Sequence, residues 1–409
     1  MLKRALPGAI GLLLCAALTN VAFAAKQYGP GASDTEIRIG NTMPYSGPAS
    51  VYSAEGIMQM GYFKMLNETK GGVNGRKITL LSLDDGYSPP KTFEQVRKLV
   101  EQEKVLGIFG SLGTPTGLSV RNYLNQKKVP QMLQLSNSSQ WNKPHQYPWS
   151  TSLNLAADQE SAALAKWLLS TKPDAKIGII YQNDDFGKDY AAGFVKGLGD
   201  KSAQVVKQVG YEATDSNADS QVLELKSSGA DVVVVAATAK FAALTIRKIA
   251  DMQWKPLEIL STGANSLSAV LKVAGTQNAV GAITVASYKD VADPTTANDK
   301  DVQDYVAFVK KYAPNINPGD SFSVLGYVSA EVTAKILEGA GDNLTRENIL
   351  KVATHLNITS LPMLANGVTI KTSPTSYLPF HEIVIQRFDG TAWRSFGKPI
   401  PAPEQSPAG

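Results

Sequence analysis

The sequence predicts an α/β protein built from two doubly wound, Rossmann-like lobes. Strand-like and helix-like patterns alternate along most of the 409 residues, and the alternation starts afresh near residue 150. Residues 231–236 include four consecutive valines, which is typical of a parallel strand buried on both faces. A chain of this length with 43% hydrophobic residues can form two domains, each with its own core.

The first β-α series runs from residue 36 to residue 135. Residues 36–42 alternate as a strand does, and residues 54–68 carry apolar side chains at helical spacing. We expect this helix to bury the face that contains Ile57, Met60, Phe63, Met65 and Leu66. The same two patterns predict strands at 77–84, 105–109 and 129–135, and helices at 91–103 and from residue 116 onward.

The second series repeats these patterns after residue 150. Its predicted strands are 176–181, 204–211, 231–236, 257–260 and 280–288, and its predicted helices are 161–169, 189–198, 220–227 and 241–252. Three further helices follow at 302–312, 324–338 and 346–353. From residue 361 the pattern changes to short strands at 367–371, 381–388 and 393–396, which we expect to pair antiparallel.

Residues 1–24 have the three parts of a secretory signal peptide. Residues 3–4 are basic, residues 9–18 are apolar, and residues 22–24, Ala-Phe-Ala, fit a cleavage site. The sole cysteine, Cys15, lies inside this segment, so the exported chain would have no thiol chemistry. We therefore expect a protein of the bacterial periplasm that does not insert into a membrane after the signal is removed.

Residues 110–116 join a short apolar strand to a helix through glycine and hydroxyl residues. Unpaired N–H groups at a helix start, together with the helix dipole, favour an anion such as a carboxylate. We expect Gly113 in the turn, Ser111 and Thr114 as hydroxyl donors, and Thr114 as the N-cap with Pro115 as the first helical residue. The alternative is that this loop only caps its helix.

Four stretches together resemble one known family. They are IRIGNTMPYSGPAS from residue 37, GGVNGRKITLLSLDD from residue 71, NDDFGKDYAAGF from residue 183 and SSGADVVVV from residue 227. From about residue 33 to residue 396 the chain is similar to the solute-binding proteins of branched-chain-amino-acid-type ABC importers, the Leu/Ile/Val-binding family. The resemblance implies the type I periplasmic binding protein fold, with two lobes, a hinge and an interlobe ligand cleft. It implies a first lobe at 34–150 plus 286–358 and a second lobe at 151–285 plus 359–400.

The resemblance also implies ligand-binding positions. Thr114 stands where the amino-acid binders use a serine to hold the ligand carboxylate, and residues 136–138 lie on the loop that completes this grip. Phe186 stands where the second lobe usually offers a tyrosine, while Tyr52 and Tyr327 match aromatic positions of the first lobe. The full set of expected ligand-binding residues is Tyr52, Ser111, Gly113, Thr114, Ser136, Asn137, Ser138, Phe186, Gly263 and Tyr327.

The loop at 261–265 departs from the amino-acid binders, which place an acidic residue there against the ligand's ammonium group. This loop holds no carboxylate, and burying an ammonium without an anion is costly. We therefore expect no side chain near the ligand that neutralises a cation, and an aromatic acid of the benzoate or hydroxycinnamate type as the ligand. The candidate aromatic walls are Tyr45, Tyr52, Tyr87, Phe186, Tyr288 and Tyr327. Lys240, Asp184 and Asp185 are candidates for polar ligand groups, with turn, cap and surface roles open for all three.

The expected function is capture of a small carboxylate by lobe closure and its delivery to the permease subunits of an ABC transporter. A branched-chain or other hydrophobic amino acid is the alternative ligand, and a receptor-linked sensor is the alternative role. An enzyme is not indicated, because the three histidines lack metal-ligand spacing and no nucleophile-elbow or phosphate-loop motif occurs. We expect no catalytic residue, metal or cofactor and a monomer. The net charge of +4 without a basic run argues against a nucleic-acid partner.

Overall fold

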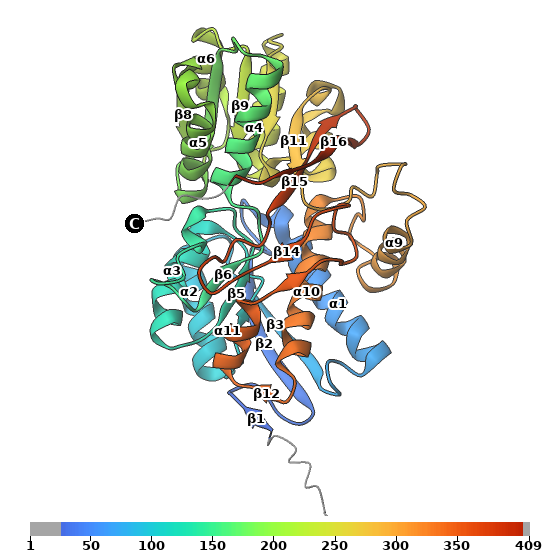
Figure 1. Ribbon diagram of the computed structural model, residues 1–409. Helices are drawn as coiled ribbons and strands as arrows, with labels where there is room; N and C mark the ends of the chain where they lie inside the picture. Colours follow the sequence, from blue (N-terminus) through green and yellow to red (C-terminus); the bar gives the residue numbers. More distant parts are fainter. Residues whose placement is uncertain (1–25, 404–409) are drawn as a thin grey trace, which may run out of the picture.

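A computed structural model describes residues 26–403 of the chain. The signal-peptide prediction for residues 1–24, and Cys15 with it, lies outside these residues. The described chain forms two α/β lobes joined by crossing segments (Figure 1). Within residues 26–403, no helix combines the length and apolarity that a membrane span requires.

The first lobe is built on a parallel sheet with the strand order β3-β2-β4-β5-β6. Its strands are β2 (Glu36–Met43), β3 (Lys77–Asp84), β4 (Ile108–Phe109), β5 (Gln131–Gln134) and β6 (Ser150–Ser152). The helices of this half of the molecule are α1 (Ser53–Lys70), α2 (Pro89–Arg97), α3 (Thr114–Gln126), α9 (Lys300–Tyr312), α10 (Ser321–Ala340) and α11 (Arg346–Ala353). Two-residue strands pair at its edges: β1 (Gln27–Tyr28) with β12 (Asn343–Leu344), and β13 (Asn357–Ile358) with β14 (Ile370–Lys371).

The second lobe is built on a sheet with the strand order β16-β15-β11-β10-β9-β7-β8. The parallel strands are β7 (Ile177–Gln182), β8 (Val205–Tyr211), β9 (Val232–Ala236), β10 (Leu257–Leu260) and β11 (Ile283–Ala286); β15 (Glu382–Phe388) and β16 (Trp393–Pro401) add antiparallel. Its helices are α4 (Ala157–Thr171), α5 (Asp185–Leu198), α6 (Asp219–Ser227), α7 (Ala239–Asp251) and α8 (Lys272–Ala274). The four valines of β9 are fully buried between β7 and β10, as the sequence predicts.

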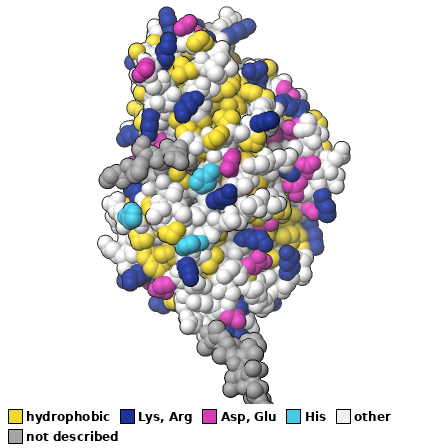
Figure 2. Space-filling model, viewed as in Figure 1, with side chains coloured by type: hydrophobic (Ala, Val, Ile, Leu, Met, Phe, Trp, Pro, Cys, Tyr) yellow, Lys and Arg dark blue, Asp and Glu magenta, His cyan; other side chains and the backbone are white. Residues whose placement is uncertain are grey.

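Short helical turns complete the description. They are η1 (Ser50–Tyr52), η2 (Lys98–Gln102), η3 (Ser139–Trp141), η4 (Gly199–Gln204), η5 (Thr262–Ala264), η6 (Leu267–Leu271) and η7 (Thr276–Ala279). Several of them follow the carboxyl ends of strands. On the face seen in Figure 2, Lys and Arg side chains are interspersed with Asp and Glu rather than gathered in one patch.

Several strand predictions are too long and several helix predictions start too late; α4 and α5, for example, begin at residues 157 and 185 rather than 161 and 189. β4 has two residues instead of five, and β11 spans 283–286 rather than 280–288. Helix α3 begins at Thr114, so Gly113 and not Thr114 is its N-cap. These ends are set by tertiary hydrogen bonds, such as Gly113 N–H to the Leu135 carbonyl, which local pattern does not encode.

The predicted buried face of α1 is confirmed for Phe63 and Leu66 and wrong for Met60, because the buried face is wider than expected and shifted about the helix axis. Met60 is 39% exposed, whereas Glu55, Gln59 and Tyr62 are buried. The reason is α10, which packs closely along α1: a Cβ on Gly326 would lie 2.5 Å from the Glu55 carbonyl oxygen. Because α10 comes from a distant part of the sequence, its contact with α1 is not visible in the pattern of α1 itself.

The lobe borders remain a proposal. β6, which lies at the first proposed border, pairs with β5 of the first sheet. That proposal assigns residues 359–400 to the second lobe. Tyr377, which is one of them, nevertheless contacts residues of the proposed first lobe. Its backbone N–H donates to Asn142 Oδ1 at 2.7 Å, and its hydroxyl donates to the Pro148 carbonyl at 3.1 Å.

Candidate functional site

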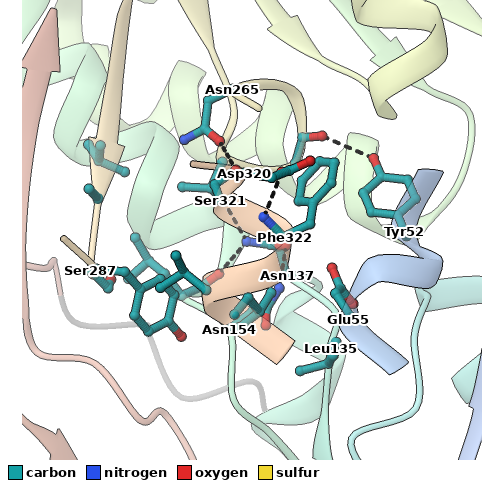
Figure 3. A pocket seen from close by; sticks show the side chains of 18 of the residues that line it. Tyr52, Glu55, Leu135, Asn137, Asn154, Asn265, Ser287, Asp320, Ser321 and Phe322 are labelled. Carbon is teal, nitrogen blue, oxygen red and sulfur yellow. Dashed lines mark hydrogen bonds between the residues drawn. The ribbon is translucent and has the colours of Figure 1, made fainter. Parts of the chain in front are cut away.

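A cavity lies between the two lobes at the carboxyl ends of their parallel strands. The loops after β4, β5, β9, β10 and β11 line it, together with the starts of α1, α5 and α10. Figure 3 shows part of this lining, with Glu55 on α1 and Ser321 and Phe322 on α10. The volume of the cavity is about 150 Å³, many times the roughly 10–15 Å³ that one water molecule needs. The cavity therefore has room for a small organic ligand at the position where open α/β sheets bind their ligands.

The structure brings most of the expected ligand-binding residues together at this cavity. The expected residues that line it are Tyr52, Gly113, Thr114, Ser136, Asn137, Phe186 and Gly263. Ser111, Ser138 and Tyr327 do not line it.

Thr114 and Ser136 form a hydrogen-bond relay at one corner of the cavity. Their hydroxyl oxygens lie 2.6 Å apart, and Ser136 Oγ also accepts the indole N–H of Trp141 at 2.7 Å and the Ser138 N–H at 3.4 Å. Because Ser136 Oγ already accepts two hydrogen bonds, we infer that Ser136 is the donor to Thr114 Oγ1 and that the Thr114 hydrogen can donate into the cavity. Thr114 also stands in the first turn of α3, whose N–H groups lack intrahelical acceptors. This corner therefore presents donors to an anion.

Gly113 is required by the shape of the same corner. Its φ is +104°, in the region that favours glycine, and a Cβ there would lie 2.4 Å from Thr116 Oγ1 and 2.7 Å from the Tyr87 ring. The predicted glycine turn thus brings the start of α3 against Tyr87, which is itself one of the predicted aromatic walls.

Asn137 links the lobes at the floor of the cavity. Its amide donates to the Leu155 carbonyl at 2.9 Å and to Thr262 Oγ1 of the second lobe at 3.0 Å. Thr262 in turn donates its hydroxyl and its N–H to the buried carboxyl of Glu160, both at 2.8 Å. Burial raises the pKa of Glu160 to about 7, and these two hydrogen bonds counteract that rise. The amide hydrogens of Asn137 are therefore used for contact between the lobes.

Tyr52 is a second link between the lobes. It precedes α1 on the first lobe, accepts the N–H of Ala239 at 2.8 Å and donates to the Gly263 carbonyl at 3.0 Å (Figure 3). Its ring packs against Phe322 with the centroids 4.5 Å apart. Tyr52 and Gly263 therefore meet across the cavity.

Replacing Tyr52 by phenylalanine should weaken ligand binding about tenfold. Each lost hydrogen bond is worth roughly 0.5–1.5 kcal/mol, and both bonds need the lobes together. The measurement is the dissociation constant for whichever of benzoate and leucine binds the unaltered protein. Tyr305→Phe is the matched control. It also removes a tyrosine hydroxyl, but one whose 2.8 Å hydrogen bond to Ser323 stays within the half of the molecule that contains Tyr305. Equal affinities of Tyr52→Phe and the unaltered protein would contradict the linking role.

The three expected residues outside the cavity have structural contacts instead. Ser111 Oγ accepts the N–H of Thr42 at 3.0 Å, which ties the loop to β2. Ser138 donates to the Asp189 carboxylate at 2.6 Å, and the same carboxylate oxygen accepts the Ser139 N–H at 2.8 Å. Tyr327 packs in the first half among the rings of Tyr62, Tyr305 and Phe308.

The other candidate residues also divide into those that line the cavity and those that do not. Tyr87 and Tyr288 line the cavity, whereas Tyr45, Lys240, Asp184 and Asp185 do not. Tyr45 shares a hydrogen bond with Ser82 on β3. Asp184 is the N-cap of α5 and accepts the Gly187 N–H at 3.0 Å, while burial raises its pKa to about 6. The cap role that the sequence left open for Asp184 is the observed one.

The expectation of a cavity without an acidic side chain is wrong, because Glu55 lines it. Glu55 extends from the first turn of α1 into the cavity (Figure 3), is 1% exposed, and its Oε2 has no hydrogen-bond partner among the described residues. Burial, together with the charge of Asp320, raises the pKa of Glu55 well above its usual range. The sequence offered a signal: Glu55 follows Tyr52 by three residues, so both lie on one side of a helical turn.

Other charged residues at the cavity are engaged. Lys289 donates to Asp299 and Asp301 at 2.8–2.9 Å. Asp320 accepts the hydroxyls of Ser266 and Ser268, and it also caps α10. Within residues 26–403, no group of three or more His, Cys, Asp or Glu side chains is arranged to hold a metal ion. The polar groups that remain for a ligand are therefore hydroxyl, amide and carboxyl groups.

The sequence reasoning missed much of the apolar lining. Phe322, Phe380 and Trp393 also line the cavity; the patterns placed Phe322 and Phe380 just before a predicted helix and a predicted strand, and Trp393 at the start of a strand. The Trp393 indole donates to the Asn265 carbonyl at 2.8 Å. No motif marks these residues, since only the folding back of the last third of the chain brings them to the cleft.

Comparisons with known proteins agree with this architecture. A family model described as periplasmic binding protein matches residues 36–387. Leu/Ile/Val-binding protein homolog 7 of Brucella abortus (strain 2308) is 25% identical over 333 residues, which are 78% of this chain and 81% of that protein.

Two solved structures share the fold at low sequence identity. A branched chain amino acid ABC transporter protein from Thermus thermophilus with bound valine has a TM-score of 0.81 and 16% identity, over 90% of this chain and 97% of that one. A solute binding protein of an ABC transporter from R. palustris in complex with benzoate has a TM-score of 0.74 and 19% identity, over 88% and 96%. One fold thus accommodates an amino acid in the first and an aromatic acid in the second.

Proposed function

Because the chain belongs to the periplasmic binding protein family, in its non-enzymatic Leu/Ile/Val-binding group, and is the solute-binding protein of an ABC transporter, we propose that its ligand is a small aromatic acid. In this proposal the protein captures the acid in the periplasm, as a monomer, and delivers it to the membrane permease subunits. Export through the signal at residues 1–24 is part of the proposal.

The donor corner at Thr114 carries the proposal. The relay from Trp141 through Ser136 directs a hydroxyl hydrogen from Thr114 into the cavity, beside the start of α3. Donors in this arrangement stabilise a carboxylate without a cationic side chain. Lys289, which also lines the cavity, is held by two aspartates and is not needed for this contact.

Flat apolar walls support an aromatic body for the acid. Phe186 and Phe322 line the cavity from the second and the first lobe, and Tyr87 and Tyr288 line it as well. Burial of an aromatic ring against other rings adds about 0.5–1.5 kcal/mol per pair beyond the area that is buried. A benzoate or hydroxycinnamate could therefore place its carboxylate at Thr114 and its ring between these walls.

Contact with both lobes supplies the proposed mechanism. A ligand that touches Thr114 on one lobe and Phe186 on the other binds the closed arrangement more tightly than an open one, and this difference in affinity drives closure. The links made by Tyr52 and Asn137 form at the same time. We propose that the closed form is the one that docks on the permease.

A hydrophobic amino acid is the second candidate ligand, and Glu55 is the observation that favours it. An ionised Glu55 would supply the anion that the loop at 261–265 lacks. The high pKa of Glu55, caused by burial and by Asp320, works against this candidate, because the carboxyl group must ionise in the cavity to pair with an ammonium.

Thermal unfolding against a ligand panel tests the choice. A ligand at about 100 times its dissociation constant adds about 2.7 kcal/mol to the free energy of unfolding. We expect benzoate or hydroxycinnamate acids to raise the unfolding temperature by several degrees, and leucine and valine to leave it unchanged. A shift with leucine or valine, and none with the aromatic acids, would refute the aromatic ligand and support the amino acid.

A further inference from the structure

Three polar side-chain atoms without partners face the same cavity. Glu55 Oε2, Tyr288 OH and Asn154 Oδ1 are buried, have no hydrogen bond among the described residues, and belong to residues that line the cavity. A buried polar atom without a partner costs roughly 1–3 kcal/mol, so three in one cavity indicate a binding role rather than chance. The atoms come from α1, from the crossing after β6 and from the crossing after β11.

The three atoms differ from the donor corner at Thr114 in the hydrogen bonds that they can form. The Thr114 hydroxyl is oriented by its relay to donate, whereas Asn154 Oδ1 can only accept and the Tyr288 hydroxyl can do both. Burial raises the pKa of Tyr288, and the charge of Glu55, which lines the same cavity, raises it further. The amide nitrogen of Asn154 is occupied, since it donates to Asn137 Oδ1 at 3.0 Å.

We propose that Glu55, Tyr288 and Asn154 form a second polar subsite that receives a hydroxyl group of the ligand, so that the protein selects hydroxylated aromatic acids. This inference rests on the proposed function. A hydroxyl group donates one hydrogen and accepts others, which matches the carboxyl, phenol and amide oxygens that line this cavity without partners among the described residues. An ammonium group donates only and would need Glu55 as an anion.

Isothermal titration with paired acids tests this subsite. The probes are benzoate against 3-hydroxybenzoate and 4-hydroxybenzoate, and cinnamate against 4-hydroxycinnamate, with leucine as the amino acid. We expect the better hydroxylated acid of each set to bind about tenfold more tightly than its parent, since a site built around a hydroxyl rejects the analogue without it. Equal affinities for hydroxylated and parent acids would overturn the subsite and leave the proposed function intact.

Variants assign the preference to the named residues. Tyr288→Phe removes only a hydroxyl group, and Glu55→Leu removes the carboxyl group; both should bring the ratio of the affinities for the hydroxylated and the parent acid close to one. Glu55→Gln keeps an accepting oxygen and should retain part of the preference. If Glu55→Leu does not fold, Tyr288→Phe and Glu55→Gln still decide the question.

Glu331→Gln is the matched control. Glu331 also has a buried carboxyl oxygen that lacks a partner in the described part of the chain, but it lies on α10 and does not line the cavity. Its variant should keep the full hydroxyl preference. An unchanged preference in Tyr288→Phe and Glu55→Gln would overturn the subsite. Binding of leucine that Glu55→Gln abolishes, with no binding of any aromatic acid, would overturn both the subsite and the aromatic ligand.

Discussion

Replacing Glu258 by glutamine is expected to flatten the dependence of folding stability on pH between pH 5 and pH 8. Glu258 lies on β10, is 6% exposed, and its Oε2 has no hydrogen-bond partner among the described residues. Burial raises the pKa of Glu258 to about 8. In the unfolded chain a glutamate has a pKa of about 4.3.

The sign follows from proton uptake in the two states. Between these two pKa values the folded protein keeps a proton on Glu258 and the unfolded chain does not, so the free energy of unfolding falls as pH rises. One such group changes the free energy of unfolding by about 1.4 kcal/mol per pH unit. The total from pH 5 to pH 8 is roughly 3 kcal/mol, because the slope falls off as pH approaches the folded pKa. The stabilisation from Glu258 is fully present below its pKa in the unfolded chain and is lost as pH rises through its pKa in the folded protein. Glu160 and Glu331, whose pKa values burial also raises to about 7, act in the same direction.

Urea unfolding at pH 5 and at pH 8 measures this effect. Glu258→Gln should lose roughly 3 kcal/mol less stability over this interval than the unaltered protein, because a glutamine does not ionise. Any constant cost of the buried amide cancels in the comparison between the two pH values. Glu347→Gln on the exposed surface of α11 is the control and should keep the full slope. Equal slopes for Glu258→Gln and the unaltered protein would show that Glu258 is ionised in the fold.

The two-lobe α/β fold follows from the sequence because its signals are local and repeated. The valines of β9 and the alternation in β2 mark strands without knowledge of their neighbours, and the elements found at 257–260 and 346–353 have the predicted bounds. The strands that were missed, such as β6 and β13, have two or three residues. Strands this short depend on the pairing partner and carry no periodic pattern of their own.

The candidate site was predictable where a loop at a strand end forms it. Gly113, Thr114 and Ser136 follow β4 and β5, and the carboxyl ends of parallel strands meet at one edge of a sheet. Glu55 was missed because the expected buried face of its helix did not include it; packing of α10 along α1 buries Glu55 and Gln59 and leaves Met60 exposed. Ser138 was expected at the ligand and instead donates to Asp189, a partner from the other lobe that no spacing rule could have identified.

Removing the Thr114 hydroxyl is expected to weaken binding of an aromatic acid by about 1.5–3 kcal/mol, which is roughly 10-fold to 150-fold. The reason is the relay, which makes this hydroxyl the donor that faces the cavity beside the first turn of α3. A hydrogen bond to a charged oxygen is about twice as strong as one between neutral groups. Thr114→Val keeps the shape of the side chain and removes only the hydrogen bond, so its dissociation constant for benzoate isolates the effect.

Two further variants separate binding from folding. Thr114→Ser restores a hydroxyl group at the same carbon and should bind within about threefold of the unaltered protein. Thr245→Val removes a buried helical hydroxyl of α7 that donates to the Phe241 carbonyl at 2.9 Å, away from the cavity, and should lower stability without changing affinity. If Thr114→Val bound benzoate as tightly as the unaltered protein, the carboxylate would have to lie elsewhere in the cavity. The anion would then be held by groups other than the start of α3, and the function proposed for this corner would no longer have its physical basis.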